Sequence, residues 1–428
     1  MEAVVYDSFG ALPELREVSD PVPPPGGAVL AVKATGLCRS DWHGWRGHDP
    51  DIRLPHVPGH EFAGEIAAVG AGVTGWRVGE RVTAPFVCAC GRCASCLAGD
   101  QQVCERQEQP GFTHWGSFAE LVVVHQAEVN LVRLPDSVGY AAAAALGCRF
   151  ATALRAVLAQ GRVSAGDWVA VHGCGGVGLS AIMVAVAAGA RVAAVDVQPA
   201  ALALAARLGA EITINASTGM ITSTRPGAST SSPTTTAASS RPPSSINPAE
   251  AAGQAIRDGG SADATPAPPT SPEIPRAAGE MPRPGGGSEA APISEPVPIS
   301  PAVGASLVAA AVREVTGGGA HVSLDALGSQ ETLTASIEGL RRRGRHVQVG
   351  LLPQRPVVPM ERVIGWELEV VGSHGMPAHA YAKMVSLVAT GALRPAELVT
   401  GELALADAPA ALAAMDGPTP PGIRVILP

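Results

Sequence analysis

The chain has 428 residues, a formal net charge of −8 and 46% hydrophobic residues, which is enough apolar material for a large core in two or three domains. These values exclude a mini-protein, a collagen-like chain and a wholly disordered chain. The mild acidity argues against a general nucleic-acid binder, which would carry a basic patch.

The first part of the chain, residues 1–150, is expected to be rich in β-strands. Short apolar runs alternate there with turns that contain Gly or Pro. These runs lie at 3–6, 28–36, 61–70, 81–86 and 118–124. No targeting signal is expected, because the start MEAVVYDSFG has no basic segment followed by an apolar one. We therefore expect a cytoplasmic protein whose eight cysteines are reduced and able to bind metal.

From about residue 151, predicted strands and helices alternate. The strands are expected at 168–173, 191–197, 211–215, 321–327 and 345–351. The helices are expected at 175–189, 199–209, 305–318 and 331–342. Such alternation predicts an α/β fold with a parallel, doubly wound sheet. The uncharged stretch 168–190 is long enough to span a bilayer, but four glycines in its first half favour a buried strand, turn and helix, so no membrane contact is expected.

The composition changes at Ser217 and changes back at Val303. Pro, Gly, Ser, Thr and Ala dominate the segment 217–303, which contains no aromatic residue and no Cys. Such a segment cannot bury enough apolar surface to offset its ordering entropy, so it is predicted to be a disordered, low-complexity insertion. It follows the strand predicted at 211–215 and is therefore expected to leave the sheet at the carboxyl end of that strand, the side on which such sheets bind cofactors. One sequence leaves open whether it is an artefact of gene prediction.

Four cysteines lie close together in the β-rich part. They are Cys90, Cys93, Cys96 and Cys104. Four thiolates from one tight lobe can surround a tetrahedral Zn²⁺, and a closed four-sulfur shell predicts a structural metal. The alternative is a set of unconnected buried or redox cysteines. Cys88 is given no role.

Residues 173–178 read Gly-Cys-Gly-Gly-Val-Gly, the G-x-G-x-x-G pattern, between a predicted strand and a predicted helix. The residues predicted to bind a dinucleotide here are Gly173, Gly175, Gly176, Val177 and Gly178. Asp196, at the end of the next strand, would accept hydrogen bonds from an adenosine ribose and repel a 2′-phosphate, which favours NAD over NADP. The alternative is a glycine-rich turn that serves packing only.

Three further segments carry candidate metal ligands: Cys38 to Asp41, Gly59 to Glu61, and Cys148. Spacing alone does not show that these segments meet. For isolated residues, a buried Cys and a hydrogen-bonded structural His are the ordinary interpretations.

The motifs GLCRSDWH, VPGHEFAGEIAAVG, CGRCASC…C, LGCRFAT and HGCGGVG, in that order, resemble the zinc-containing alcohol dehydrogenases of the medium-chain dehydrogenase/reductase superfamily. The resemblance covers essentially the whole chain except the insertion. It implies a GroES-like β-rich catalytic domain from residues 1–150 and 373–428. It also implies an NAD-binding Rossmann domain over 151–372, interrupted by 217–303, and a homodimer or homotetramer.

By resemblance, Cys38, His60 and Cys148 are the ligands of a catalytic zinc with one open position, giving two zinc ions per subunit. Asp41 resembles the carboxylate that orients the ligand histidine. Glu61 resembles a carboxylate that approaches the metal during ligand exchange.

The resemblance also assigns residues around the substrate and the cofactor. Ser40 matches the hydroxyl that accepts the substrate proton, and His43 matches a histidine that ends a proton relay to solvent. Arg39 is expected to contact the cofactor pyrophosphate, Phe86 to line the substrate pocket, and Thr152 to lie near the nicotinamide. The ordinary alternatives are a solvated Arg39, an exposed His43 beside Trp42, and a Phe86 that belongs to the core. The basic run 341–345 is interpreted as a solvated helix end.

Together these features predict an enzyme that oxidises a small alcohol to an aldehyde or ketone by hydride transfer to NAD⁺, with zinc as Lewis acid. One alternative is a related dehydrogenase acting on a polyol, an amino acid or a thiol adduct. A second is a zinc-independent quinone or enoyl reductase. A third is a degenerate dehydrogenase that serves as a binding or scaffold protein through the insertion. The sequence does not identify the physiological alcohol, the favoured direction or the choice between dimer and tetramer.

Overall fold

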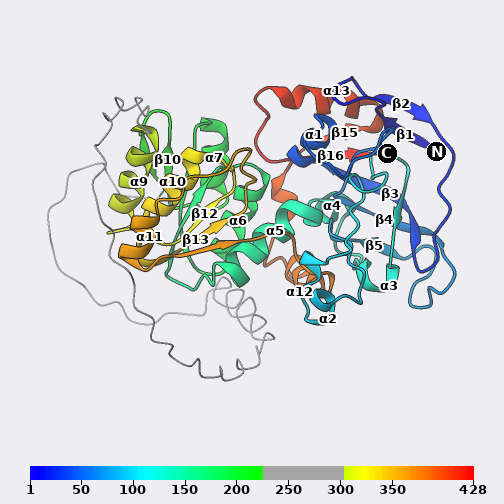
Figure 1. Cartoon of the computed structure of the whole chain (residues 1–428), viewed down its shortest axis with the longest axis horizontal. Coiled ribbons are helices and arrows are strands. Elements are labelled where there is room, and N and C mark those ends of the chain that lie inside the picture. Colours follow the sequence, from blue (N-terminus) through cyan, green and yellow to red (C-terminus); the bar gives the residue numbers. More distant parts are fainter. Residues whose placement is uncertain (225–302) are drawn as a thin grey trace, which may run out of the picture.

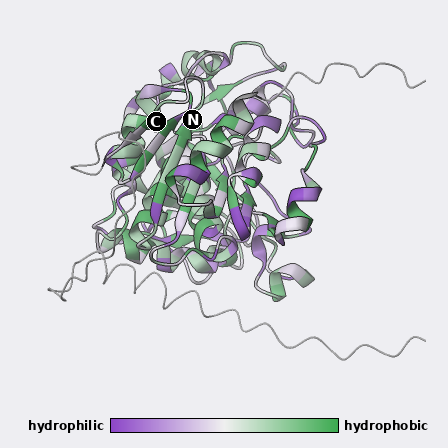
Figure 2. Cartoon of the chain, turned by 90° about the vertical axis from the view of Figure 1, so that its left-hand side faces the viewer, coloured by the Kyte–Doolittle hydropathy of each residue, from purple (hydrophilic) through white to green (hydrophobic). Residues whose placement is uncertain are grey.

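The computed structural model describes residues 1–224 and 303–428, which form two lobes, each built around its own sheet (Figure 1). The N-terminal part and the red C-terminal end form one lobe, and the green to orange middle of the chain forms the other. Hydrophobic residues gather in the inner strands, and hydrophilic residues are frequent on the outer helices and loops (Figure 2). In the described part of the chain, no helix combines the length and the apolar composition needed to cross a membrane.

The first lobe builds its main sheet from both ends of the chain. The strand order is β15-β16-β3-β4-β5-β7, with β6 paired to β3. The strands are β3 (Ala28–Leu37), β4 (Phe62–Val69), β5 (Arg81–Thr83), β6 (Leu121–Val124), β7 (Val132–Arg133), β15 (Val399–Ala404) and β16 (Ile423–Leu427). Because β16 pairs antiparallel with β3, residues near the C-terminus complete the sheet that strands of the N-terminal part form.

Smaller elements surround this sheet. β1 (Glu2–Val5) and β2 (Glu14–Glu17) form a separate two-stranded sheet. The helices are α1 (Arg39–Trp45), α2 (Ala94–Leu97), α3 (Ala127–Asn130), α12 (Ala378–Ala389) and α13 (Ala408–Ala413). Short 3₁₀ turns are η1 (Gln101–Val103), η4 (Pro395–Leu398), η5 (Leu405–Asp407) and η6 (Ala414–Asp416).

The second lobe is a seven-stranded sheet in the order β11-β10-β9-β8-β12-β13-β14, parallel except for β11. The strands are β8 (Trp168–His172), β9 (Arg191–Asp196), β10 (Ile212–Asn215), β11 (Ile221–Ser223), β12 (Ala320–Asp325), β13 (Leu340–Gln348) and β14 (Glu369–Gly372). The prediction of a doubly wound parallel sheet beside a β-rich lobe is confirmed.

Helices cover both faces of this second sheet. α6 (Gly176–Ala187) and α7 (Pro199–Arg207) pack on one face, and α9 (Val303–Val315) and α10 (Gln330–Glu338) pack on the other. α11 (Met360–Trp366) lies against β13 and α10. Every residue of the central strand β8 is buried, because a parallel sheet covered on both faces excludes water from each side.

A nearly continuous helical run connects the lobes. It consists of α4 (Tyr140–Ala144), the π-helical turn η2 (Leu146–Phe150), α5 (Ala151–Arg155) and the π-helical turn η3 (Ala156–Gln160). α4 contacts β3 and β4 of the first sheet, whereas η2 and α5 contact α6 of the second lobe. The boundary expected between residues 150 and 151 therefore falls inside a helical run.

The structure corrects the expected start of the insertion at Ser217. Residues 216–218 form a turn, and β11 then returns antiparallel along β10. The chain therefore does not leave the sheet at the carboxyl end of β10. Instead β11 carries it back to the amino end, where Thr224 hydrogen-bonds to the backbone just before β10. The rest of the insertion, residues 225–302, lies outside the described residues.

A second correction concerns the helix expected over 331–342. α10 ends at Glu338 with Gly339 as its C-cap, and β13 begins at Leu340, which is buried and pairs with β12. The basic run is therefore part of a strand rather than a solvated helix end. Arg345 within it is buried and forms an ion pair with Glu369 at 2.5 Å.

Candidate active site

Cys38, His60 and Cys148 come from three separate segments and meet at one point. Cys38 is the N-cap residue of α1 directly after β3, His60 precedes β4, and Cys148 lies in the π-helical turn η2. Their potential ligand atoms all lie within 4.8 Å of one another. Cys38 and His60 are buried, and Cys148 is half-buried. The fold thus joins three side chains that sequence spacing alone does not connect.

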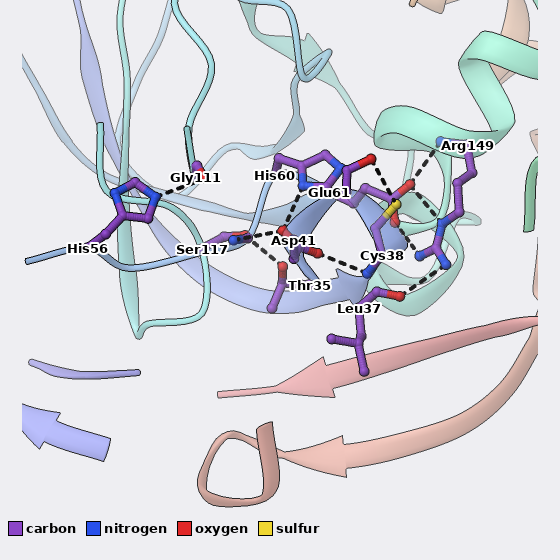
Figure 3. Close-up of polar contacts among 12 residues, drawn as sticks. Thr35, Leu37, Cys38, Asp41, His56, His60, Glu61, Gly111, Ser117 and Arg149 are labelled. Atoms are coloured by element: carbon purple, nitrogen blue, oxygen red, sulfur yellow. Dashed lines mark hydrogen bonds and ion pairs between the residues drawn. The ribbon is translucent and has the colours of Figure 1, made fainter. Parts of the chain in front are cut away.

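Asp41 fixes the orientation of His60 (Figure 3). Its buried carboxylate accepts hydrogen bonds from His60 Nδ1 at 2.8 Å and from the backbone N–H groups of Cys38 at 2.9 Å and Gly59 at 3.1 Å. In a neutral imidazole whose Nδ1 donates to a carboxylate, Nε2 carries the lone pair. That Nε2 is buried and has no hydrogen-bond partner among the described residues. An oriented, unpartnered imidazole nitrogen beside two thiols fits a Cys₂His zinc site with one open position.

The electrostatics at this point favour a thiolate on Cys38. A hydrogen bond with Cys148 lowers the pKa of the Cys38 thiol well below its usual range, and the positive charge of Arg149 acts in the same direction. Since the thiolate is the form that binds metal, these neighbours prepare the sulfur for coordination.

Glu61 and Arg149 form a buried ion pair behind the cluster (Figure 3). The Arg149 guanidinium donates to both carboxylate oxygens of Glu61, from Nε to Oε1 at 3.0 Å and from Nη2 to Oε2, while Nη1 donates to the Leu37 carbonyl at 3.0 Å. The backbone N–H of Arg149 donates to Glu61 Oε1 at 2.8 Å. The Arg149 guanidinium therefore links Leu37 and Glu61 to Arg149 itself. These are the residues next in sequence to the three candidate metal ligands.

Arg149 received no role from the sequence. Its position directly after Cys148 is the one sequence signal for a role in the site. The role of a buried charge depends on its ion-pair partner, and the spacing of residues in the sequence does not identify that partner. The pKa of Glu61 is raised by burial, and the charge of Arg149 opposes that rise. Arg149 also approaches the glycine-rich turn, because a Cβ at Gly176 would lie 2.5 Å from its Cδ. The same side chain thus lies between the candidate metal cluster and the candidate cofactor loop.

The remaining candidates on α1 are placed differently from one another. Ser40 Oγ lies 3.7 Å from Cys38 Sγ, beside the cluster. His43 Nδ1 lies 2.9 Å from Nδ1 of His48, a residue that the sequence patterns do not single out. Arg39 is exposed and donates to the backbone carbonyl of Met415, so in this structure its guanidinium does not contact the glycine-rich turn.

Two aromatic rings stand against His60. Phe86 is buried with its ring edge-on to the imidazole at a centroid distance of 6.1 Å. The ring centroid of Phe112, which the sequence patterns do not single out, lies 5.2 Å from that of His60. His374, which comes from the C-terminal part of the chain, packs against Phe86 with a ring-centroid distance of 5.1 Å. Thr152 is buried on α5, one turn beyond Cys148.

The glycine-rich turn has the backbone that close approach of a dinucleotide requires. Gly173 has φ +88°, a conformation that favours glycine. A Cβ at Gly178 would lie 1.8 Å from the Gly173 carbonyl oxygen, so only glycine fits there. A Cβ at Gly175, the N-cap of α6, would face open space. The open N-terminus of α6, with half-buried Val177 in its first turn, fits a pyrophosphate.

Asp196 ends β9 next to this turn. Its Oδ2 accepts a hydrogen bond from the Cys174 N–H at 2.6 Å, and its Oδ1 accepts one from the Gln198 N–H at 2.8 Å. The carboxylate is half-buried. It therefore holds the glycine-rich turn while keeping lone pairs for a ribose hydroxyl.

The four clustered cysteines converge around α2 in the first lobe. Their sulfur atoms lie 3.4 Å apart for Cys93 and Cys96, 3.7 Å for Cys93 and Cys104, and 4.0 Å for Cys90 and Cys96. Sulfurs at about 2.3 Å from a tetrahedral zinc lie about 3.8 Å from one another, so the set fits zinc without rearrangement. Cys88 is apart from this set, with its sulfur 3.5 Å from the Pro85 carbonyl oxygen.

Two family models match the chain. The model described as "Alcohol dehydrogenase GroES-like domain" matches residues 24–136, and the model described as "Zinc-binding dehydrogenase" matches 176–227 and 301–390. The second match skips 228–300, which is therefore an insertion relative to that family.

Individual relatives agree with the family models. An alcohol dehydrogenase from Moraxella sp. (strain TAE123) is 39% identical over 218 residues, and one from Geobacillus stearothermophilus is 38% identical over 217 residues. Each match covers 50% of this chain and 64% of the relative. Among solved structures, the alcohol dehydrogenase TADH from Thermus sp. ATN1 is 27% identical, with a TM-score of 0.72 over 100% of this chain and 99% of that chain.

Proposed function

Because the chain belongs to the zinc-containing alcohol dehydrogenases of the medium-chain dehydrogenase/reductase superfamily, we propose that it catalyses the reversible oxidation of an alcohol to an aldehyde or ketone with NAD⁺. The observation that carries the proposal is the buried, unpartnered Nε2 of His60 between two thiols. This group lies in a fold that also presents a dinucleotide-binding turn. The substrate is proposed to be a small-molecule alcohol, and nucleic acids and membranes are not proposed as partners.

In this proposal Cys38, His60 and Cys148 hold a catalytic zinc, and Cys90, Cys93, Cys96 and Cys104 hold a structural one. The catalytic zinc supplies Lewis acidity that makes an alcohol more acidic. Closed coordination by four sulfurs leaves the second site without an open position, so its contribution is to stability.

The chain's own residues orient the site and move the proton. Asp41 keeps the His60 lone pair aimed at the metal position. Ser40 accepts the substrate hydroxyl proton, and His43, three residues along α1 on the same face, passes it outward. Phe86 forms an apolar wall next to His60 that excludes water from the reacting centre. Glu61, one residue from His60, is proposed as the carboxylate that would approach a bound metal during ligand exchange, for which its oxygens would have to leave Arg149.

NAD supplies the hydride acceptor. Gly173, Gly175, Gly176, Val177 and Gly178 cradle its pyrophosphate in the proposed complex, and Asp196 accepts from the adenosine ribose. Thr152 is proposed to lie beside the nicotinamide. The proposed contact of Arg39 with the pyrophosphate requires its guanidinium to leave the Met415 carbonyl.

The proposed domains are a catalytic domain of residues 1–150 and 373–428 and a cofactor domain of residues 151–372. A homodimer or homotetramer is proposed, and the edge strand β14 offers a site for it. Exposed apolar side chains lie on and near this edge, among them Met360, Ile364 and Val370. A cytoplasmic location is proposed because all eight cysteines are free.

Absorbance of NADH tests the function when purified protein of known zinc content is mixed with NAD⁺ and a panel of alcohols. We expect turnover with a primary or secondary alcohol. Preference for polyols, amino acids or thiol adducts would point to a related dehydrogenase. Reduction of quinones or enones without catalytic zinc would replace the proposal, and absence of turnover in zinc-replete protein would favour a binding role.

A further inference from the structure

His43 and His48 form a pair on the surface side of the candidate active site. Their Nδ1 atoms are 2.9 Å apart, so one carries a hydrogen and the other accepts it. The backbone reinforces the pair, because the His48 N–H donates to the His43 carbonyl at 3.0 Å. His48 is therefore held against His43 by two hydrogen bonds just beyond the end of α1.

The two imidazoles differ in exposure. His43 is half-buried, whereas His48 is exposed. The indole of Trp42 stands edge-on to both rings, at 4.9 Å from His43 and 5.7 Å from His48, and donates to Asp416 at 2.8 Å. This packing fixes both rings while leaving the outer one in contact with water.

The surroundings of His43 favour its neutral form. Burial lowers its pKa, and the neighbouring His48 and Arg39 lower it further, while the Cys38 sulfur acts in the opposite direction. These are the ionisable groups that face His43 from the elements packed around it. A neutral imidazole with one N–H and one lone pair can receive a proton on one nitrogen and release one from the other.

We propose that His48 is a positioning and relay residue that carries the substrate proton from His43 to solvent. This inference rests on the proposed function. His43 Nε2 takes the proton released through Ser40, and the hydrogen on His43 Nδ1 moves to His48 Nδ1. His48 then releases its Nε2 hydrogen to water. One proton enters and one leaves, and reduction of an aldehyde runs the same sequence backwards.

The test compares His48→Gln with the unmodified protein. Gln keeps a polar side chain but cannot pass a proton. The matched control is His379→Gln, because His379 is also exposed and also pairs with a side chain, Gln101 at 3.3 Å, but lies on α12 away from α1. Three quantities are measured: kcat against pH at low buffer concentration, its restoration by added imidazole, and the dissociation constant for NADH.

In His48→Gln, kcat at pH 7 is expected to fall by roughly 3- to 10-fold, less than the 10²- to 10⁴-fold typical of losing a general acid or base at the substrate. Added imidazole restores it, and NADH affinity is unchanged. A second readout needs neither zinc nor NAD. In NMR titration of isotope-labelled histidine, the pKa of His43 rises in His48→Gln and stays constant in His379→Gln.

The outcomes separate the two proposals. If the unmodified protein oxidises alcohols but His48→Gln matches it in kcat and is insensitive to imidazole, the relay through His48 is wrong and the proposed function stands. An unchanged His43 titration in His48→Gln also overturns the relay. If the unmodified protein oxidises no alcohol, the proposed function fails and the relay fails with it.

Discussion

Replacing Arg149 with Met should destabilise the protein strongly. The side chains of Arg149 and Glu61 are 8% and 0% exposed, so the substitution leaves a carboxylate buried without its cation and the Leu37 carbonyl without its donor. Breaking a buried ion pair by removing one partner costs about 3–5 kcal/mol. For a chain of this size, such a loss lowers Tm by roughly 4–7 °C.

The assay is thermal unfolding of the zinc-containing protein, with zinc content measured in parallel. The control is Arg394→Met, which breaks an exposed pair with Glu397 at 2.8 Å and should cost no more than about 1 kcal/mol. Because Glu61→Gln removes the stranded charge, the double variant Glu61→Gln/Arg149→Met should recover part of the lost Tm.

The reasoning is refuted if Arg149→Met melts like Arg394→Met. It is also refuted if the double variant is less stable than Arg149→Met alone, because the stranded carboxylate would then not be the source of the loss. Zinc loss in Arg149→Met would fit the role of this guanidinium in tying together the residues that neighbour Cys38, His60 and Cys148.

Three further predictions concern separate parts of the molecule. Cys93→Ser should lose one of two zinc ions and melt at a lower temperature, because three sulfurs no longer complete the tetrahedral coordination. Elemental analysis and thermal unfolding measure these changes, and retention of both zinc ions would contradict the four-sulfur site. Asp196→Ala should raise KM for NAD⁺ and reduce the discrimination against NADP⁺, because the carboxylate both accepts a hydrogen bond from the Cys174 N–H and repels a 2′-phosphate. Steady-state kinetics measure both effects. An unchanged ratio of kcat/KM for NAD⁺ to kcat/KM for NADP⁺ would show that Asp196 does not select the cofactor. Burial lowers the pKa of His172 from 6.5 to about 4 in the folded protein. The unfolded chain therefore takes up a proton on this histidine at a higher pH than the folded protein does, so stability falls as pH drops from about 6.5 to about 4. The slope of Tm against pH in this window should be smaller in His172→Gln, and an equal slope would assign the acid sensitivity to other groups.

Local patterns in the sequence predicted the parts of the structure that local spacing determines. The strand, turn and helix around Gly173 depend on backbone geometry over a few residues, and Asp196 follows at the end of the next strand. The converging sulfurs of the cysteine cluster likewise come from one short segment. In each case the chemistry requires residue types at a fixed separation, so the pattern carries the geometry.

Features that depend on contacts distant in sequence could not be derived this way. The meeting of Cys38, His60 and Cys148 followed from family resemblance, because three segments converge only through the sheet and the helical run. β11 leaves no signal in the sequence, because a three-residue strand rich in Ser and Thr has no alternation and is defined only by its pairing with β10. The start of β13 resembles a helix end in the sequence, because its arginines continue a helical pattern beyond Gly339.

Alcohol-dependent formation of NADH by Cys38→Ser tests the central claim most directly. The account predicts that this variant keeps the zinc bound by Cys90, Cys93, Cys96 and Cys104 but forms no NADH above background. The reason is that the substitution removes one of the three side chains that converge on the proposed catalytic zinc position. Full alcohol oxidation by Cys38→Ser, with zinc content equal to that of the unmodified protein, would contradict the account.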